Sequence, residues 1–402
     1  MDDTLTTRCC VAGGGPAGMI LGLLLARAGI DVVVLEKHAD FLRDFRGDTV
    51  HPSTLEVMYE LGLLEAFLTR PHDKMRSLGA QIGDSFVQIA DFTHLPTRCG
   101  FIAFMPQWEF LDFLAVEARR YPQFRLMMRT EATGLLREGD RVTGVSALTE
   151  GRPIQIDAEL VIATDGRHST LREAAGLAVH DFGAPMDVLW LRLSRKSSDP
   201  AQSLGRIDAG RIFAMLNRGD YWQCAYVIAK GDFALTRAAG LPAFQAGIVH
   251  LVPYLHDRVQ EIDDWEKVKL LTVTVNRLKQ WYQPGLLLIG DAAHAMSPIG
   301  GVGINLAVQD AVAAANVLVP RLRQGKAGLE DLRAVQRRRE LPTRLTQQLQ
   351  LLIQNRVIRN VLQATVTPKP PLLLRLLGAF PMLRRLPARL MGMGFRPEHI
   401  RH

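Results

Sequence analysis

Cysteine is scarce in this chain of 402 residues, and the four cysteines are scattered. They form no C-x-x-C pair and no His/Cys cluster, which argues against a disulfide framework and against a metal site. Cys9 and Cys10 are neighbours in a segment that reads as a buried strand. The cysteine pattern therefore favours a reducing, cytoplasmic location.

Aromatic residues make up only 7% of the chain, and low-complexity segments are lacking. The length and the 48% apolar content predict a large core and two closely joined domains. Residues 9–26 are uncharged, but acidic residues precede them and a glycine run interrupts them. We interpret this stretch as strand, turn and helix rather than as a signal peptide or a membrane span.

Acidic residues are rare near the end of the chain. Residues 321–402 hold 17 Lys and Arg against 4 Asp and Glu, whereas the rest of the chain holds 31 against 37. Arginines that solvate outer helix faces, a helical cap or dimer face, and a peripheral contact with a membrane all fit this pattern. No nucleic-acid-binding module accompanies the charge, so we expect no nucleic acid partner.

The N-terminal region has the pattern of a βαβ unit. Residues 9–12 read as a buried strand, residues 16–28 as a helix and residues 32–35 as a second strand. Further helices are expected over residues 54–68 and 108–120. This order is typical of an α/β dinucleotide-binding fold.

The sequence pattern changes between residues 182 and 275, where short segments of alternating apolar and polar residues are separated by turn residues. We interpret this region as an antiparallel sheet inserted into the α/β domain, with residues 72–98 adding strands to it. From Ile304 onward the chain reads as helix, with breaks expected at Pro342, residues 368–371, Pro381 and Pro387.

The first motif with chemical content is a G-x-G-x-x-G turn between the first strand and the first helix. Such glycines let the backbone approach a pyrophosphate, whose charge is stabilised by free N–H groups at the helix N-terminus. Glu36 ends the next strand, where a carboxylate can accept hydrogen bonds from ribose hydroxyls and disfavours a 2′-phosphate. The motif thus predicts bound FAD or NAD, with these candidate residues: Gly13, Gly15, Pro16, Ala17, Gly18 and Glu36.

A second glycine-rich motif follows the apolar run at residues 286–289. Asp291 comes at the carboxyl end of that strand, which is where open α/β sheets bind ligands. A helix expected to begin near Ile304 would place free N–H groups against the pyrimidine edge of a flavin.

A third motif, Asp165-Gly166, opens the segment at residues 165–172. Together the three motifs resemble those of the FAD-dependent aromatic hydroxylases of the para-hydroxybenzoate hydroxylase superfamily. The resemblance covers about residues 8–60, 99–120, 155–175 and 280–320, with every motif in the family's order. It implies cofactor-binding roles for Asp165, for Asp291 on the ribityl chain, and for Arg46 and Gln107. The segment that lines the isoalloxazine ring would hold Pro298, Gly303, Ile304 and Asn305.

The resemblance also implies a reaction. NADPH or NADH would bind transiently and reduce the flavin, and dioxygen would add to form a C4a-hydroperoxide that hydroxylates an aromatic ring. His51 follows the Arg46 segment and is a weak candidate for a catalytic base, against the commoner outcome of a structural histidine. No arginine pair that could clamp a carboxylate occurs in residues 213–226, so we expect a bulky, apolar substrate. The candidate pocket residues are Trp190, Met215, Trp222 and Tyr226, each of which could equally belong to the core of the sheet.

We therefore predict an α/β fold with a Rossmann-like FAD domain (residues 1–72, 99–181 and 276–330), an inserted antiparallel substrate domain (73–98 and 182–275) and a helical C-terminal region (331–402). The predicted function is an FAD-dependent aromatic monooxygenase, acting as monomer or homodimer. Two alternatives stay open, namely a flavin-dependent reductase of a lipophilic or prenyl substrate and a non-catalytic binding protein of the same fold.

Overall fold

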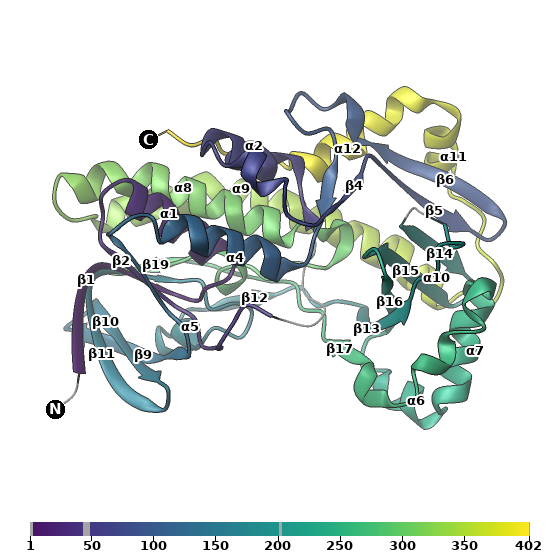
Figure 1. The fold of residues 1–402 in the computed structure, drawn as a ribbon, viewed down its shortest axis with the longest axis horizontal. Helices are drawn as coiled ribbons and strands as arrows, with labels where there is room; N and C mark the ends of the chain where they lie inside the picture. Colours follow the sequence, from purple (N-terminus) through teal and green to yellow (C-terminus); the bar gives the residue numbers. More distant parts are fainter. Residues whose placement is uncertain (1–2, 43–48, 201–202, 402) are drawn as a thin grey trace.

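The computed structural model describes residues 3–42, 49–200 and 203–401. Its largest sheet has the order β19–β20–β11–β1–β2–β8, and β10 and β9 continue from β11 as an antiparallel ribbon (Figure 1). The strands are β1 (Asp3–Ala12), β2 (Val32–Leu35), β8 (Phe124–Met127), β9 (Thr130–Glu138), β10 (Arg141–Thr149), β11 (Arg152–Ala163), β19 (Tyr282–Gln283) and β20 (Leu286–Leu288).

The strands β20, β11, β1, β2 and β8 run parallel, and both faces of this sheet are covered. Cys9 and Val11 face the core beneath α1 (Pro16–Arg27), α4 (Gln107–Ala118) and α8 (Gly303–Arg323), while Cys10 faces a second core under the β9–β10 ribbon. Burial on both sides explains why residues 9–12 are apolar without alternation. All four cysteines are buried and free.

The second sheet has seven strands in the order β17–β13–β16–β15–β14–β5–β6. Its neighbours are antiparallel except β14 and β5, which are parallel. The strands are β5 (Ser77–Ile82), β6 (Ser85–Asp91), β13 (Met186–Ser194), β14 (Leu204–Asp208), β15 (Arg211–Asn217), β16 (Tyr221–Ala229) and β17 (Lys269–Leu271).

Two helices in this region were missed from the sequence, α6 (Phe233–Ala238) and α7 (Leu241–Leu251). Phe244, Ile248 and Leu251 of α7 pack against one face of the seven-stranded sheet. Their spacing of four and three residues is typical of a helix, but the alternating segments on either side favour strands.

Short elements connect the two large sheets. A three-stranded sheet holds β3 (Thr49–Val50), β7 (Ile102–Phe104) and β4 (Asp73–Met75), and a two-stranded sheet holds β12 (Val179–Asp181) and β18 (Asn276–Leu278). The expected helix over residues 54–68 is divided into α2 (Pro52–Glu60) and α3 (Leu64–Phe67), because Gly62 adopts φ 74° and ends the first. A short helix, α5 (Thr170–Ala174), follows β11.

The C-terminal third is mainly helical. The apolar segment Ile299–Arg323, which includes α8, is long enough to cross a membrane, but 83% of its apolar window is buried inside the protein, as in a core helix. The predicted break at Pro342 is wrong, since α9 (Leu329–Ile353) continues through it. A proline inside a helix costs about 3 kcal/mol, and the buried face of α9 offsets that cost.

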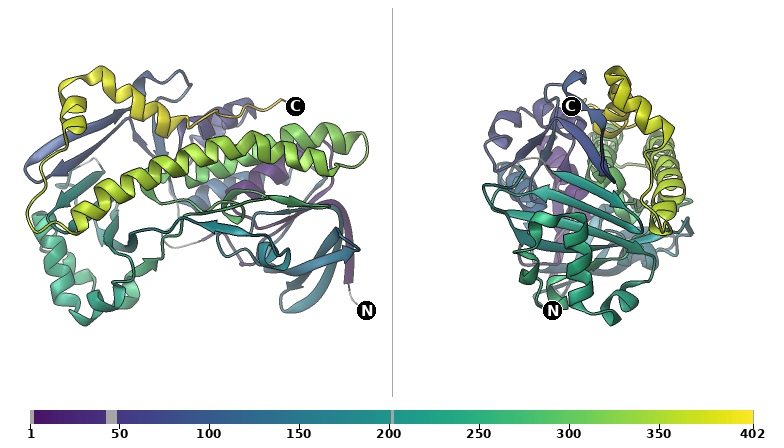
Figure 2. Two further views of the ribbon diagram at one scale, coloured as in Figure 1. Left: turned by 180° about the vertical axis from the view of Figure 1, so that it is seen from behind. Right: turned by 90° about the vertical axis from the view of Figure 1, so that its right-hand side faces the viewer.

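After α9 the chain passes through α10 (Arg359–Leu362), α11 (Leu372–Ala379) and α12 (Arg385–Gly392), and then returns along the helical layer toward α2 (Figure 2). Near its end, the backbone N–H of Ile400 donates to Glu60 of α2 at 2.8 Å. The C-terminal region thus packs onto the remainder of the protein, and α11 and α12 lie over β6.

Candidate active site

The glycine turn after β1 has the backbone geometry that its glycines require. Gly13 has φ +114°, and a Cβ at Gly18 would overlap the Gly13 carbonyl oxygen. In contrast, a Cβ at Gly15 would meet no atom of residues 3–42, 49–200 or 203–401 within 4 Å. Gly15 caps α1, and Pro16 is the first residue of that helix, so free N–H groups face open space there.

Three segments that are far apart in sequence meet at this edge of the sheet. Thr164, just after β11, donates a hydrogen bond from Oγ1 to the Gly13 carbonyl at 2.7 Å. Arg172 donates from Nη1 to the Ala292 carbonyl at 3.1 Å, which joins the second segment to the third. A Cβ at Gly290 would lie 3.4 Å from Cβ of Ala17, so the third segment also adjoins the glycine turn.

Two candidate carboxylates lie beside this junction. Glu36 is buried next to the turn, since a Cβ at Gly14 would lie 3.1 Å from its Oε2, and its Oε1 accepts from the backbone N–H of His38 at 3.0 Å. Asp165 accepts from Ser169 Oγ at 2.5 Å and from the Leu171 N–H at 3.1 Å. Burial raises the pKa of the Asp165 carboxyl above its ordinary value, against the opposing effect of these hydrogen bonds.

The third segment continues as a glycine loop into α8. Asp291 is half-buried at the start of this segment, and Pro298 is half-buried further along it. Gly300 and Gly301 have φ of +77° and +63°, and the Gly301 carbonyl accepts from Thr49 Oγ1 at 2.8 Å. Within the described part of the chain, a Cβ at Gly303 would meet nothing within 4 Å, so the N-terminus of α8 also faces open space there.

Two predicted residues of this loop region have their side chains turned elsewhere. The amide oxygen of Asn305 accepts from Ser53 Oγ at 2.7 Å and from Thr54 Oγ1 at 2.9 Å, which ties α8 to α2. Ile304 is buried in the main core. Their backbone groups, rather than these side chains, lie at the start of α8.

His51 is fully buried, and its Nε2 lies 3.2 Å from the Gly300 carbonyl oxygen. Burial lowers the pKa of His51 from 6.5 to about 4, so the ring is neutral at physiological pH and donates to that carbonyl. This geometry gives His51 a role in holding the glycine loop and makes it a poor proton acceptor.

The two residues assigned from the family resemblance differ in what the structure shows of them. Gln107 is half-buried at the first position of α4, a helix that packs against α1. Arg46 lies outside the described residues.

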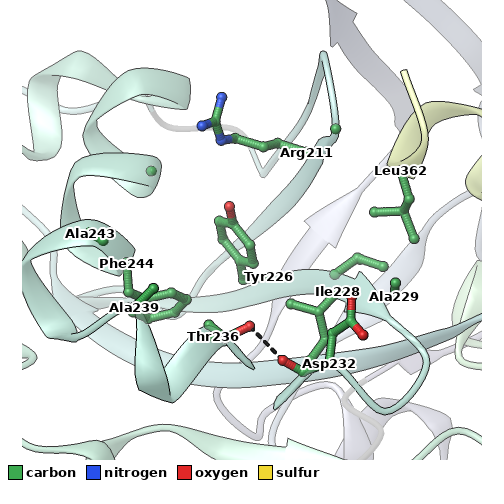
Figure 3. A pocket seen from close by; sticks show the side chains of 13 residues that line it. Arg211, Tyr226, Ile228, Ala229, Asp232, Thr236, Ala239, Ala243, Phe244 and Leu362 are labelled. Atoms are coloured by element: carbon green, nitrogen blue, oxygen red, sulfur yellow. Dashed lines mark hydrogen bonds between the residues drawn. The ribbon is translucent and has the colours of Figure 1, made fainter. Parts of the chain in front are cut away.

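The four predicted pocket residues do not share one surface, so the expectation of a single pocket is wrong. Met215 and Trp222 are fully buried in the core beneath α7, whereas Trp190 packs on the opposite face of the sheet. Side chains alternate along strands, and neighbouring strands in register keep that alternation. Tyr226 lies on the α7 side and lines a cavity of about 270 Å³ with Arg211, Asp232 and Phe244 (Figure 3).

The face that carries Trp190 is directed toward the rest of the molecule. At its β15–β16 end, Arg218 lies 5.9 Å from the ring of Phe104 and donates from Nε to Gln223 at 3.0 Å. Phe104 pairs with Thr49, the residue that binds Gly301. The inner face of the seven-stranded sheet is thereby linked to the glycine loop through β7 and β3.

A buried ionic network behind the loop was not found from the sequence. Asp310 of α8 lies 2.5 Å from Nε2 of His294 and accepts from the Gly290 N–H at 3.1 Å and from Arg339 Nε at 2.9 Å. Arg339 Nη1 lies 3.6 Å from Glu398. The attraction of His294 and Arg339 outweighs the burial that would raise the pKa of Asp310, so that pKa is lowered.

Glutamines on α9 also hold the loop region. Gln350 donates to the Ser297 and Ile299 carbonyls, both at 2.9 Å, and accepts from the Ser297 N–H at 3.2 Å. Gln347 donates to the Asn276 and Ala295 carbonyls at 2.7 and 3.1 Å. In the sequence these glutamines recur at helical spacing, which could have indicated one buried polar face of α9. Polar residues on a helix usually face solvent, so the pattern alone does not predict their burial.

Comparison with known proteins agrees with this geometry. The FAD binding domain family matches residues 6–348. Over 392 residues the chain is 32% identical to 6-methylpretetramide 4-monooxygenase of Streptomyces rimosus, covering 96% of this chain and 93% of that protein.

Two further proteins show the breadth of the likeness. Rifampicin monooxygenase of Streptomyces venezuelae is 28% identical over 307 residues, covering 75% of this chain and 61% of that protein. The structure of OxyS anhydrotetracycline hydroxylase from Streptomyces rimosus superposes with a TM-score of 0.75 at 23% identity, over 99% of this chain and 78% of that one. This last likeness concerns the fold.

Proposed function

This chain belongs to the FAD binding domain family and is an FAD-dependent aromatic monooxygenase, and from that premise we propose that it hydroxylates a bulky, fused-ring phenol of the polyketide type. NAD(P)H and dioxygen are the co-substrates typical of this family. The relative named for 6-methylpretetramide matches nearly the full length of both chains and supports this substrate class.

The observation that carries the cofactor assignment is the convergence of the three segments at one edge of the sheet. The open space before α1 suits a pyrophosphate, and Glu36 beside the turn suits a ribose. We assign Asp291 to the ribityl chain, and Pro298 with the backbone of residues 303–305 to the ring. When bound, FAD supplies the redox chemistry by which one oxygen atom of O₂ reaches the substrate.

The chain's own residues position and enclose the reacting groups. The N-terminus of α8 directs free N–H groups toward the open space at Gly303 and would stabilise negative charge there. His51, Thr49 and Gln350 hold the glycine loop in one conformation. We assign His51 as a positioning residue rather than a base.

We place the substrate between this loop and the inner face of the seven-stranded sheet. That face presents Trp190, Ala214 and Ala225. Two arginines also belong to it: Arg192 lies over the Tyr221 ring, and Arg218 donates to Gln223. An apolar face whose two guanidinium groups already contact other side chains suits a neutral polycycle better than a small aromatic carboxylate. We further propose that the chain divides into an FAD domain, an inserted substrate domain and a helical C-terminal region, and that the protein acts in the cytoplasm.

The test begins with the purified protein. Absorption bands near ~375 and ~450 nm, with FAD released on denaturation, are expected. The protein is then given NADPH or NADH with 6-methylpretetramide, and with para-hydroxybenzoate as the small-ring control. Incorporation of one labelled atom from ¹⁸O₂ into the polycycle alone would support the proposal. Substrate reduction without oxygen uptake would favour the reductase alternative, and protein that never takes up FAD would favour the binding-protein alternative.

A further inference from the structure

One edge of the molecule exposes an unusual number of large apolar side chains. In the described part of the chain twenty such side chains are exposed, and eight lie within residues 366–386. Seven of them occupy α11, the turn after it and the start of α12, at the edge beyond β6, and the eighth lies in the segment before α11 (Figure 1). We call them the C-terminal apolar face: Val366, Leu372, Leu373, Leu376, Phe380, Met382, Leu383 and Leu386.

This face is the outer side of a segment that is already packed on its inner side. Leu377 of α11 and Ala388 of α12 are buried, the latter in a core with Phe92 and Phe104. Arg384 donates to the Leu377 and Gly378 carbonyls, each at 2.7 Å, and to Gln88 of β6 at 2.6 Å. The exposed apolar side chains therefore project from a segment that is packed and hydrogen-bonded on its inner side. The side chains of Leu372 and Met382 are 70% and 72% exposed.

The charge around this face has one sign. Residues 341–397 contain nine Lys and Arg and no Asp or Glu. Lys369, Arg375, Arg385 and Arg389 are exposed between and beside the apolar side chains. Alternation of large apolar and basic side chains on short helices is the composition of interfacial segments that insert shallowly into anionic bilayers.

We propose that the C-terminal apolar face docks onto the surface of an anionic lipid membrane, with the apolar side chains at the acyl boundary and the arginines at the headgroups. A second copy of this chain fits less well, because a two-fold contact would bring the same basic residues of both copies together. Nucleic acid would match the charge but would leave the leucines without an apolar partner.

The face connects to the proposed active site through α12. Leu386 is exposed at the start of this helix, whereas Met391 near its end has its Cε 3.8 Å from the position of a Cβ at Gly300. Docking would therefore hold the glycine-loop end of the molecule close to a membrane in which an apolar substrate concentrates.

The test is cosedimentation of the full-length, FAD-loaded protein with vesicles of phosphatidylcholine alone or mixed with phosphatidylglycerol. We expect retention that requires phosphatidylglycerol, falls with added salt, and drops at least ~10-fold when Leu372, Leu373 and Met382 are all changed to Gln. The matched control changes Leu235, Leu148 and Val179, which are exposed elsewhere, to Gln and should bind like the parent.

Sedimentation velocity of the same proteins tests the alternative that a second copy of this chain covers the face. Absence of vesicle binding, or binding equally reduced by the control variant, would overturn the proposal. So would a dimer that the Leu372→Gln, Leu373→Gln, Met382→Gln variant dissociates while the parent ignores vesicles. Because none of these readouts requires turnover, they are independent of the proposed hydroxylation.

Discussion

Nε2 of His294 lies 2.5 Å from Oδ2 of Asp310, and the same carboxylate accepts from Arg339 through its other oxygen. Both His294 and Asp310 are almost completely buried. The pair joins the segment that holds Asp291 to α8, and Arg339 adds α9. The position of the glycine loop thus depends on a charged contact in the interior.

The first prediction concerns that carboxylate. Asp310→Asn should lower the free energy of unfolding at pH 7 by about 3–5 kcal/mol, because it leaves the buried Arg339 guanidinium with only the more distant Glu398 as counter-charge. The folded-state pKa of Asp310 is lowered, so its stabilising effect is present above the unfolded-state pKa and is lost as the pH falls through the folded-state value. Urea unfolding as a function of pH measures both effects. Glu330→Gln, which breaks an exposed pair with Arg333, is the control and should cost under about 1 kcal/mol.

The glycine turn separates folding from cofactor binding. Gly18→Ala should destabilise the protein, since the added Cβ overlaps the Gly13 carbonyl. Gly15→Ala should leave the melting temperature of the apoprotein unchanged, because its Cβ would meet no atom of the described residues within 4 Å, and yet weaken FAD binding at least ~10-fold. Gly378→Ala in α11 is the control for FAD binding and should keep the parental affinity, while its melting temperature should rise because alanine favours a helix over glycine. Unchanged FAD affinity in Gly15→Ala would contradict the assigned pyrophosphate site.

The hydrogen bonds from Gln350 to the glycine loop should control which fraction of the NAD(P)H consumed leads to hydroxylated substrate. Gln350→Ala removes three hydrogen bonds to the segment Ser297–Ile299 and leaves buried carbonyls unpaired, at about 1–3 kcal/mol each. We expect retained FAD but a lower ratio of hydroxylated product to NAD(P)H consumed. Gln363→Ala, at an exposed position, should keep the parental ratio. An equal ratio of product to NAD(P)H consumed in the two variants would show that Gln350 does not position the loop for the reaction.

His51 should affect stability at low pH rather than the pH profile of turnover. Its folded-state pKa of about 4 is below the ordinary 6.5, so the unfolded chain binds the extra proton first as the pH falls. Stability should therefore decline between pH 6.5 and 4, by about 3 kcal/mol from this group. His51→Gln should reduce that decline and leave the kcat profile between about pH 6 and 9 unshifted, because a group with this pKa does not titrate there. Loss of an ionisation from the profile in this variant would restore His51 as a catalytic base.

The two faces of the seven-stranded sheet give opposite predictions for substrate binding. Ala214→Leu adds bulk on the inner face and should raise KM about 10–100-fold. Tyr226→Phe alters the α7 side and should leave KM unchanged, although Tyr226 lines the cavity there. Steady-state kinetics of the two variants with the polycyclic substrate decides between the faces. A raised KM in Tyr226→Phe alone would place the substrate in that cavity.

Local chemistry made part of the fold predictable. The strand, glycine turn, helix and strand at residues 9–35 were placed to within a few residues at most boundaries, since buried parallel strands and a capped helix have strong local patterns. The helices over residues 233–251 and the unbroken α9 were missed. Proline at position 342 carries a local penalty that only packing against other segments offsets.

The sequence by itself determined which residues can bind a dinucleotide, because a Gly without a Cβ and a carboxylate after a strand have the same chemistry wherever they occur. The tertiary structure alone decided which side chains meet. Alternation along paired strands separated Trp190 from Met215 and Trp222, and burial turned His51, Asn305 and Gln350 into supports of the glycine loop. Side-chain direction and desolvation arise from contacts between distant segments, and no local pattern in the chain contains them.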